Sequence, residues 1–320
     1  MRGADSVERV FNLPLRAGGE PFDVAVHYSG DLLVIEAEPS RAESSLEAAS
    51  AVRSMSNRVA ERKTIDDIVH EAARQVRALT EFDRVMVYRF DQDGAGEVIA
   101  ESVRPGIGSF LGQRYPASDI PRQARALYER SWLRIIADID AETPKVRPAL
   151  GPSGGPLDLS MSMLRAVSPI HIEYLRNMGV GASLSISILH QGKLWGLFAC
   201  HHYGPHHVSY ERRTAAELFG QIFSYMLESR EQEIEARHVE RARNLHDRLV
   251  NSVATASGPE SLTPFLGELC GLAACEGVSL HMGGQTARHG DSLEADRLQT
   301  LVAFLDARPT LGVFHTHHLG

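Results

Sequence analysis

Several features are missing from this 320-residue sequence, and each absence excludes a class of protein. No apolar run approaches the ~20 residues that a bilayer-spanning helix needs, so we expect no membrane association. The first residues contain no apolar signal region, and three cysteines do not make a disulfide framework. We therefore expect a cytoplasmic protein with reduced thiols. The net charge of -8 argues against a nucleic-acid partner, which would favour a basic surface.

Motifs of common enzymes are missing as well. The sequence has no P-loop, no G-x-G-x-x-G and no Cys-x2-Cys pair, and the G-x-S-x-G match at 151–155 (GPSGG) lies in a Pro/Gly-rich loop and not at the strand-to-helix turn that a nucleophile elbow needs. It has 15 histidines, but His201-His202 and His206-His207 are adjacent pairs, which point to opposite faces of a strand. The HTHH run at 315–318 would place two histidines on one face if it is extended. A histidine-rich metallohydrolase is thus a disfavoured alternative, and we predict neither a metal site nor an enzyme.

What is present is typical of a globular protein with roughly two domains: 43% apolar and 23% charged residues. Residues 7–38 read as three β-strands, with a tight turn at Ser29-Gly30-Asp31. Three strands alone make a poor domain, so residues 1–40 are expected to be the last strands of a domain whose beginning is absent.

The central region, 41–228, alternates helical and strand patterns. Helices are predicted at 64–80, where Thr64 and Asp67 resemble a capping box, and at 169–178, closed by Gly179. Strands are predicted at 84–90, 96–102, 183–189 and 194–202. This order predicts an α+β domain around a mostly antiparallel sheet flanked by helices. A helical run from about 209 to 256 exceeds typical globular helices, so its end, 229–256, is expected to be a connector or a dimer seam.

The stretch YPASDIPRQARALY (115–128) is an unusual helix start. Pro121 disfavours the α conformation for Ile120, which leaves the Asp119 carbonyl outside the helical bonds and able to accept from a ligand N–H. The Asp119 carboxylate beside a helix N-terminus is favoured in its charged form. The alternative is plain N-capping by Ser118 or Asp119, with Pro121 in the first turn.

Two further clusters carry polar chemistry. In RAVSPIHIEY (165–174), Ser168 can cap a helix that places His171 and Tyr174 on one face. Arg165, just before it, and Arg134 are suited to fork onto carboxylates, although surface ion pairs are the ordinary alternative. In ASLSISIL (182–189), the serines at 183, 185 and 187 share one face, which is directed either to solvent or to a ligand. His201 on the next strand is expected to be buried and to need a hydrogen-bond partner.

Together these segments resemble the photosensory core of a bacteriophytochrome. The carrying motifs are FDRVMVYRF (82–90), GEVIAES (96–102), YPASDIPRQARALY (115–128), LRAVSPIHIEYLRNMGVGASLSISI (164–188) and LWGLFACHH (194–202). The resemblance implies a partial PAS domain at 1–40, a bilin-binding GAF domain at 41–228, a connector helix at 229–256 and a truncated PHY domain at 257–320. It also implies a homodimer formed through the GAF and connector helices, and an output kinase or other effector in the intact parent.

The resemblance further implies a chromophore, the linear tetrapyrrole biliverdin, whose ring isomerisation is the light signal. The Asp119 carbonyl would accept from the pyrrole N–H groups, with His171 nearby, often through a shared water. Ile120 and Pro121 belong to the same step, and Tyr174 lies beside His171. The two propionates would be bound by Tyr128, Arg134, Arg165, Ser168, Ser183 and Ser185. The terminal ring would contact Tyr88, Tyr115 and Met178, and His201 would donate to its carbonyl.

The cysteines depart from the family pattern. Bacterial members attach biliverdin through a cysteine before the PAS domain, and the position used by plant and cyanobacterial members is Ile170 in this sequence. Neither Cys200, Cys270 nor Cys275 matches an attachment site, so non-covalent binding is expected. A pigment-free GAF module for regulation or dimerisation is the alternative.

Overall fold

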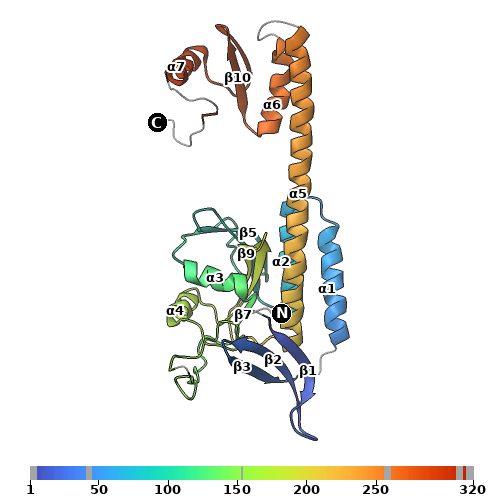
Figure 1. The fold of residues 1–320 in the computed structure, drawn as a ribbon, viewed down its shortest axis with the longest axis vertical. Helices are drawn as coiled ribbons and strands as arrows, with labels where there is room; N and C mark the ends of the chain where they lie inside the picture. The colour runs from blue at the N-terminus through green and yellow to red at the C-terminus, as the bar shows by residue number, and fades with distance from the viewer. Residues whose placement is uncertain (1–5, 41–44, 153, 256–260, 308–312, 315–320) are drawn as a thin grey trace. The chain divides into compact units, whose positions relative to one another are not determined.

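The computed structural model describes residues 6–40, 45–152, 154–255, 261–307 and 313–314 (Figure 1). They divide into two compact units, Met1–Glu231 and Gln232–Gly320, which we describe separately. The first unit combines antiparallel sheets with helices, so the α+β class is confirmed. The finer division at residues 40, 228 and 256 stays a prediction. In the described residues no helix is long and apolar enough to cross a bilayer.

The first sheet is formed by the three strands expected at the N-terminus. They are β1 (Glu8–Pro14), β2 (Pro21–Ser29) and β3 (Leu32–Pro39), paired antiparallel in the order β1-β2-β3. Ser29 pairs with Leu32, so Gly30 and Asp31 form a two-residue turn. Gly30 has φ 59°, a conformation that glycine adopts without steric cost.

The second sheet has six strands in the order β6-β5-β4-β9-β8-β7, and all neighbours are antiparallel. The strands are β4 (Arg84–Phe90), β5 (Gly96–Val103), β6 (Arg114–Tyr115), β7 (Leu133–Ile136), β8 (Ala182–His190) and β9 (Lys193–His202). The sequence also predicts a turn at His190-Gln191-Gly192-Lys193, between β8 and β9, and this turn is confirmed. Gln191 (φ 51°) and Gly192 (φ 76°) form it, and both angles suit a tight hairpin.

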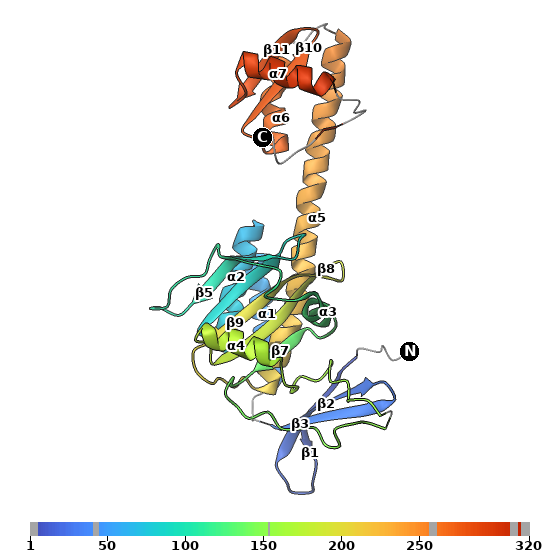
Figure 2. The ribbon, with the colours of Figure 1, turned by 90° about the vertical axis from the view of Figure 1, so that its left-hand side faces the viewer.

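Helices cover both faces of this sheet (Figure 2). On one face lie α1 (Ser45–Ala60), α2 (Ile65–Thr80) and the first part of α5 (Tyr210–Thr255). Thr64 caps α2 as predicted, because its side chain accepts from the Asp67 N–H. The α3 (Arg122–Arg130) and α4 (Pro169–Asn177) helices lie over the other face.

The main hydrophobic core fills the space between the sheet and the first group of helices. Its fully buried side chains include Val85, Val87, Ile186, Phe198, Cys200, Phe219 and Phe223. Successive strand residues point to opposite faces, so the alternate residues of the same strands face α3 and α4. This leaves one face of the sheet for packing and the other for a site.

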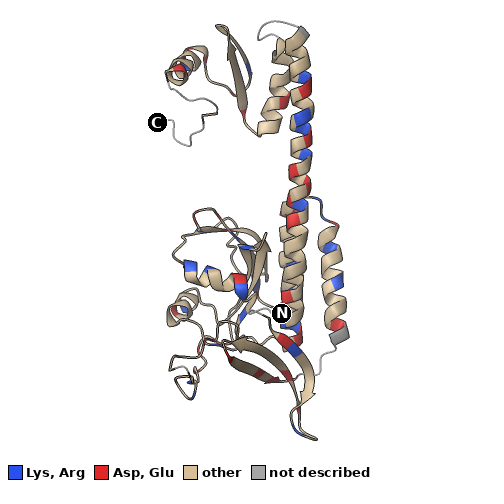
Figure 3. Cartoon of the chain, viewed as in Figure 1, with Lys and Arg blue, Asp and Glu red and all other residues tan. Residues whose placement is uncertain are grey.

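The second unit contains the rest of α5, a 3-10 turn at Thr263–Phe265, α6 (Leu266–Ala273), the hairpin β10 (Gly277–Met282) and β11 (Gln285–Gly290), and α7 (Ala295–Asp306). Of the elements after residue 260, only α7 was predicted, from the helical pattern of SLEADRLQTLVAFLDA (292–307). Along this part of α5, basic and acidic side chains alternate and most of the surface is exposed (Figure 3). Arg248 on α5 forms two hydrogen bonds with Glu268 on α6, at 2.7 and 2.8 Å.

Candidate functional site

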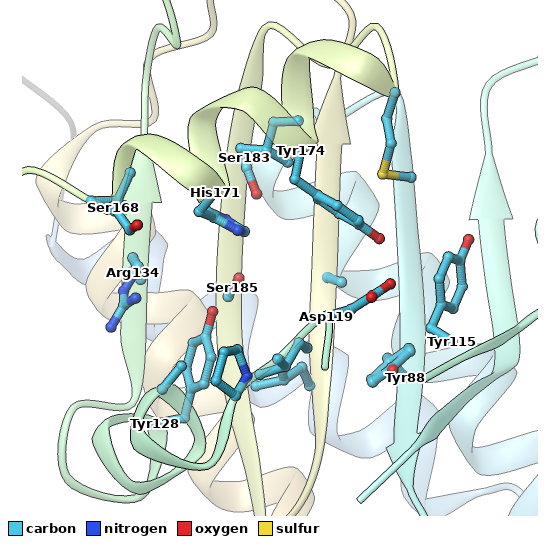
Figure 4. A pocket seen from close by; sticks show the side chains of 18 of the residues that line it. Tyr88, Tyr115, Asp119, Tyr128, Arg134, Ser168, His171, Tyr174, Ser183 and Ser185 are labelled. Carbon is cyan, nitrogen blue, oxygen red and sulfur yellow. The ribbon is translucent and has the colours of Figure 1, made fainter. Parts of the chain in front are cut away.

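A cavity of about 410 Å³ lies against the sheet face that α3 and α4 cover (Figure 4). Strands β4, β5, β8 and β9 supply one wall, and the 115–128 segment and α4 supply the others. Every predicted site residue except Arg165 lines this cavity: Tyr88, Tyr115, Asp119, Ile120, Pro121, Tyr128, Arg134, Ser168, His171, Tyr174, Met178, Ser183, Ser185 and His201. Residues far apart in the sequence are therefore brought to one place.

The segment around Asp119 does not behave as an ordinary helix cap. Pro121 (φ -59°, ψ 154°) precedes α3 and no side chain caps the helix, so the alternative of N-capping by Ser118 or Asp119 is wrong. The helix uses the Pro121 carbonyl, which accepts from Ala124 at 2.8 Å and from Arg125 at 3.1 Å. Within the described residues no backbone N–H donates to the Asp119 carbonyl, which remains available to a ligand.

Three tyrosines surround Asp119 at one end of the cavity. The ring centroids of Tyr88 and Tyr115 are 5.9 Å apart. Burial raises the pKa of Tyr88 to about 12, and the Asp119 carboxylate adds to the rise. Burial also raises the pKa of Tyr115 and of Tyr174. All three hydroxyls are therefore protonated near neutral pH and can donate hydrogen bonds without adding charge.

Two neutral histidines contribute both donors and acceptors. His201 is 8% exposed, and burial lowers its pKa to about 4, with Arg84 and His171 adding to the shift. Its Nδ1 atom has no hydrogen-bond partner. Burial and the nearby Arg134 lower the pKa of His171. Each ring thus has one N–H and one lone pair near neutral pH.

Arg134 and Arg165 form a cationic region, and among the described residues neither guanidinium forms an ion pair within 4 Å, although Glu36 and Asp158 lie near enough to Arg165 to affect its pKa. The Arg134 guanidinium lies 4.9 Å from the Tyr128 ring centroid, and its Nε and Nη2 atoms are buried without partners. The Nη2 atom of Arg165 is also buried without a partner. Burial lowers the pKa of Arg165 to about 10, and Arg134 adds to the shift. The expectation of ordinary surface ion pairs is therefore wrong for both arginines.

Arg165 is the predicted site residue that the cavity lining does not include. Its Nη1 donates to the Ser162 carbonyl at 2.7 Å, which directs part of the guanidinium toward its own loop. The positive charge of Arg134 nevertheless contributes to the lowered pKa of Arg165, which indicates that the two guanidinium groups lie close together. Arg165 therefore lies near Arg134, although it is not among the residues that line the cavity.

The serines face the cavity and the protein interior. Ser183 (6% exposed) and Ser185 line the cavity, and Ser187 is fully buried and donates to the Tyr128 carbonyl at 2.7 Å. The alternative that this row of serines faces solvent is therefore wrong. Ser168 occupies the N-cap position of α4 as predicted, but its side chain forms no capping bond. Its hydroxyl belongs to the cavity lining.

The sequence reasoning missed most of the apolar lining. Strand residues Met86, Val98, Leu197 and Ala199 line the cavity, and so do Ser118, Gln123, Ala124, Val167, Ile170 and Leu175. The strand residues could have been found, because each lies two or four positions from a predicted site residue or pairs across the sheet with one. Ala124 and Leu175 could have been found as well, because they lie four positions from Tyr128 and His171 on α3 and α4. Ser118 and Val167 lie in loops, which have no fixed alternation.

The histidine pairs do not form a metal centre. The described residues contain no group of three or more His, Cys, Asp or Glu side chains that could hold a metal ion. His202 and His206, which are spaced as His-x3-His, stack with ring centroids 4.5 Å apart. The Nε2 atom of His206 lies 2.8 Å from the Thr80 carbonyl. The HTHH run at 315–318 lies outside the described residues.

Comparison with known proteins identifies the family. A model of the GAF domain matches residues 64–226, and the chain belongs to the GAF domain family. Cyanobacterial phytochrome B of a Nostoc species is 37% identical over 303 residues, which cover 93% of this chain and 40% of that protein. The bacteriophytochrome of Pseudomonas aeruginosa is 38% identical over 309 residues, which cover 94% of this chain and 42% of that protein.

The fold agrees with these relationships. The solved photosensory core module of the Stigmatella aurantiaca phytochrome superposes with a TM-score of 0.76 and 39% identity, covering 96% of this chain and 61% of that one. The resemblance to a phytochrome photosensory core is therefore confirmed. The chain spans about 40% of the length of the curated relatives it matches.

Proposed function

We propose that the chain senses red and far-red light by binding a linear tetrapyrrole, biliverdin, in this cavity. The observation that carries the proposal is the polarity of the cavity (Figure 4). Arg134, with unpaired buried N–H groups, lies at one end, Tyr88 and Tyr115 lie at the other, and His171 lies between them. Homology to phytochromes supports light sensing by a phytochrome-like module. The bound bilin would supply the light absorption and the double bond that isomerises.

The arginine end fits two carboxylates. A buried guanidinium without an acceptor is costly, and bidentate pairing with a carboxylate removes that cost. Arg134 and Arg165 together have three buried nitrogens without partners. They would bind the propionates of biliverdin, and the hydroxyls of Tyr128, Ser168, Ser183 and Ser185 would complete the binding site.

The middle of the cavity fits a protonated ring system. The Asp119 carbonyl has no backbone donor among the described residues, and a neutral His171 has a lone pair. These two acceptors would bind the pyrrole N–H groups and stabilise their positive charge. The Asp119 carboxylate is the nearby negative charge that favours the cationic form.

The tyrosine end fits the ring that moves. Tyr88, Tyr115 and Met178 would contact the terminal ring, and Tyr174 would pack beside His171, with which its ring stacks at a centroid distance of 6.2 Å. The N–H of neutral His201 would donate a hydrogen bond to the ring carbonyl. A neutral donor suits this position, because burial lowers the pKa of His201 to about 4 and the ring is uncharged near pH 7.

We propose that binding is non-covalent. Cys200 is fully buried in the helix-facing core, and burial raises its pKa, so it cannot act as a nucleophile from the cavity wall. Ile170 occupies the position that carries the attachment cysteine in plant and cyanobacterial members. Neither Cys270 nor Cys275 corresponds to a family attachment site.

Mixing the purified chain with biliverdin tests this function. We expect a red-shifted, structured absorption band that changes under red light, and complete loss of pigment on denaturation. Arg134→Gln should weaken binding, whereas Arg114→Gln is the matched control, since Arg114 is 72% exposed and pairs with Glu97. The absence of a band in the wild-type protein would refute bilin binding. Pigment that stays with the denatured chain would refute non-covalent attachment.

The pigment-free GAF module predicts a different result, namely that His171→Ala changes neither a pigment spectrum nor the binding of a partner.

The proposed partner is a second copy of the chain, which would cover exposed apolar residues of α5 such as Leu218 (44% exposed) and Tyr225 (74% exposed). A monomer in light-scattering measurements would refute it. The cytoplasmic location and the association with an output effector stay predictions.

A further inference from the structure

Arg125, on α3, connects three backbone carbonyls around Asp119. Its Nη1 atom lies 2.9 Å from the Ile120 oxygen, 3.1 Å from the Gly94 oxygen and 3.5 Å from the Ala117 oxygen. Ala117 and Ile120 stand on either side of Asp119, and Gly94 belongs to the turn between β4 and β5. A single guanidinium therefore fastens the Asp119 segment to the sheet.

The turn at Gly94 leaves space for this guanidinium. Gly94 has φ 84°, and a Cβ atom there would lie 2.9 Å from both Nη1 and Nη2 of Arg125. The turn is closed by its own bonds, from the Asp91 N–H to the Ala95 carbonyl at 2.8 Å and from the Gly94 N–H to the Asp91 carbonyl at 3.1 Å. Glycine is thus required both by the backbone angle and by the close approach of Arg125.

We propose that Arg125 is a positioning residue that keeps the Asp119 carbonyl directed into the cavity. Arg125 is not part of the cavity lining, so it acts through the backbone. The Asp119 N–H donates to the Pro116 carbonyl at 3.1 Å, and Arg125 holds the Ile120 carbonyl. These two contacts fix both sides of the peptide group whose oxygen is the acceptor. The effect of Arg125 on a bound pigment rests on the proposed bilin-binding function, but its backbone contacts can be tested in the pigment-free chain.

Two substitutions separate geometry from charge. Arg125→Lys keeps the positive charge, but its side chain is one bond shorter, so its ammonium nitrogen cannot occupy the Nη1 position that contacts the three carbonyls. Gly94→Ala keeps Arg125 and displaces its guanidinium. Arg122→Ala is the matched control, because Arg122 is exposed on the first turn of the same helix.

Hydrogen exchange of the pigment-free chain measures the backbone directly. We expect amides of the 115–125 segment to exchange at least several-fold faster in Arg125→Lys and Gly94→Ala, with Arg122→Ala unchanged. Tryptophan fluorescence melts of the same samples identify any variant that is unfolded. Wild-type exchange in folded Arg125→Lys would overturn the inference whether or not the chain binds pigment.

A pH titration of the pigment-bound chain measures the consequence. Loss of one well-placed acceptor should lower the pH at which the protonated pigment band disappears by about one unit in Arg125→Lys. A purely electrostatic role predicts wild-type behaviour for the lysine variant, and that result would overturn the positioning role. Failure of the wild-type protein to bind biliverdin would instead refute the proposed function, while the exchange measurement still decides the role of Arg125.

A separate observation concerns two cysteines of the second unit. The Sγ atoms of Cys270, on α6, and Cys275, just before β10, are 3.8 Å apart. The chain turns back at Ala274 (φ 49°), and the Cys275 N–H donates to the Cys270 carbonyl at 3.2 Å. The Cys270 thiol also donates to the Cys275 carbonyl at 2.8 Å. The helix end therefore holds both thiols in contact, with Cys275 exposed.

We infer that this pair is a reversible oxidation site for low-molecular-weight disulfides such as oxidised glutathione. Burial raises the pKa of Cys270, so the exposed Cys275 is the sulfur that attacks first. Its thiolate attacks the oxidant, a mixed disulfide forms, and one glutathione leaves as a thiol. Cys270 then attacks Cys275, the protein disulfide forms, and the second glutathione leaves. The two protons and two electrons of the pair end on the two glutathione thiols.

Intact-mass and peptide mapping after incubation of the chain with oxidised glutathione test this site. We expect loss of two hydrogens from the peptide with both cysteines, reversal by dithiothreitol, and an unreacted Cys200 as internal control. Cys270→Ser should stop at a stable mixed disulfide on Cys275. Separate adducts on both cysteines of the wild-type chain, or no reaction, would overturn the proposal.

Discussion

Buried His201 should make the stability of the first unit depend on pH. Its pKa is lowered from 6.5 to about 4, chiefly by burial, with Arg84 and His171 contributing. The folded state therefore excludes a proton that the unfolded state binds below about pH 6.5. The free energy of unfolding must then fall as the pH drops from 6.5 toward 4. Below about pH 4 the contribution of His201 no longer changes with pH.

The size of the effect follows from the two pKa values. At about pH 4.5, unfolded His201 is almost fully protonated and the folded form is mostly neutral. The linkage relation then gives a loss of roughly 2.5 kcal/mol relative to neutral pH. Replacement by glutamine removes the titration and keeps a polar side chain. The pH-dependent loss of stability should accordingly be smaller in His201→Gln by about this amount, whatever the constant cost of the substitution.

Urea unfolding followed by tryptophan fluorescence is the suitable assay. The chain has only Trp132 and Trp195, and both belong to the first unit, so the signal reports that unit alone. His246→Gln, an exposed position on α5, controls for the loss of a histidine elsewhere. Equal losses of stability in the wild-type chain and His201→Gln between about pH 7.5 and pH 4.5 would refute the assignment of a low pKa to this ring.

Three further outcomes are expected. Phe219→Ala empties a fully buried core position and should lower the free energy of unfolding by about 3–5 kcal/mol in urea titrations; a cost below ~1 kcal/mol would contradict its core role. Thr64→Ala removes the cap of α2 and should cost about 1 kcal/mol, whereas Thr64→Ser should restore most of it. Arg134→Gln should weaken biliverdin binding about 10- to 100-fold in absorbance titrations, and unchanged affinity would contradict its role as a carboxylate ligand.

The sequence predicted the parts of the fold that depend on local patterns. Strand patterns predicted the three strands of the first sheet and β4, β5, β8 and β9 of the second, and the Thr64 cap predicted the start of α2. The short strands β6 and β7 were not predicted. The Asp119-Ile120-Pro121 step was predictable because proline restricts the residue before it whatever the tertiary context. The α6 helix and the β10–β11 hairpin were not predicted. Their short segments contain glycines and small residues, which have weak periodicity.

The side-chain contacts of the site were harder to predict. Arg165 was expected in the lining, but its bond to the Ser162 carbonyl depends on how the 144–168 loop folds, and no local pattern encodes that loop. Ser168 was expected to cap α4, but although it occupies the N-cap position its side chain forms no capping hydrogen bond and instead belongs to the cavity lining, a choice that depends on tertiary packing. Arg125 was unnoticed, since its three acceptors are backbone atoms that residue types do not reveal.

The chemistry of the cavity is ultimately set by the packing on the opposite face of the sheet. Cys200 and His201 are adjacent on β9, so when Cys200 enters the core with Phe198, His201 must face the cavity. Gly196 fixes this register, because a Cβ atom there would meet the Tyr88 carbonyl oxygen on β4. A shift of one residue would bring the thiol into the cavity and a histidine into an apolar core. The α1, α2 and α5 helices therefore determine which polar atoms a ligand meets, although they do not line the cavity.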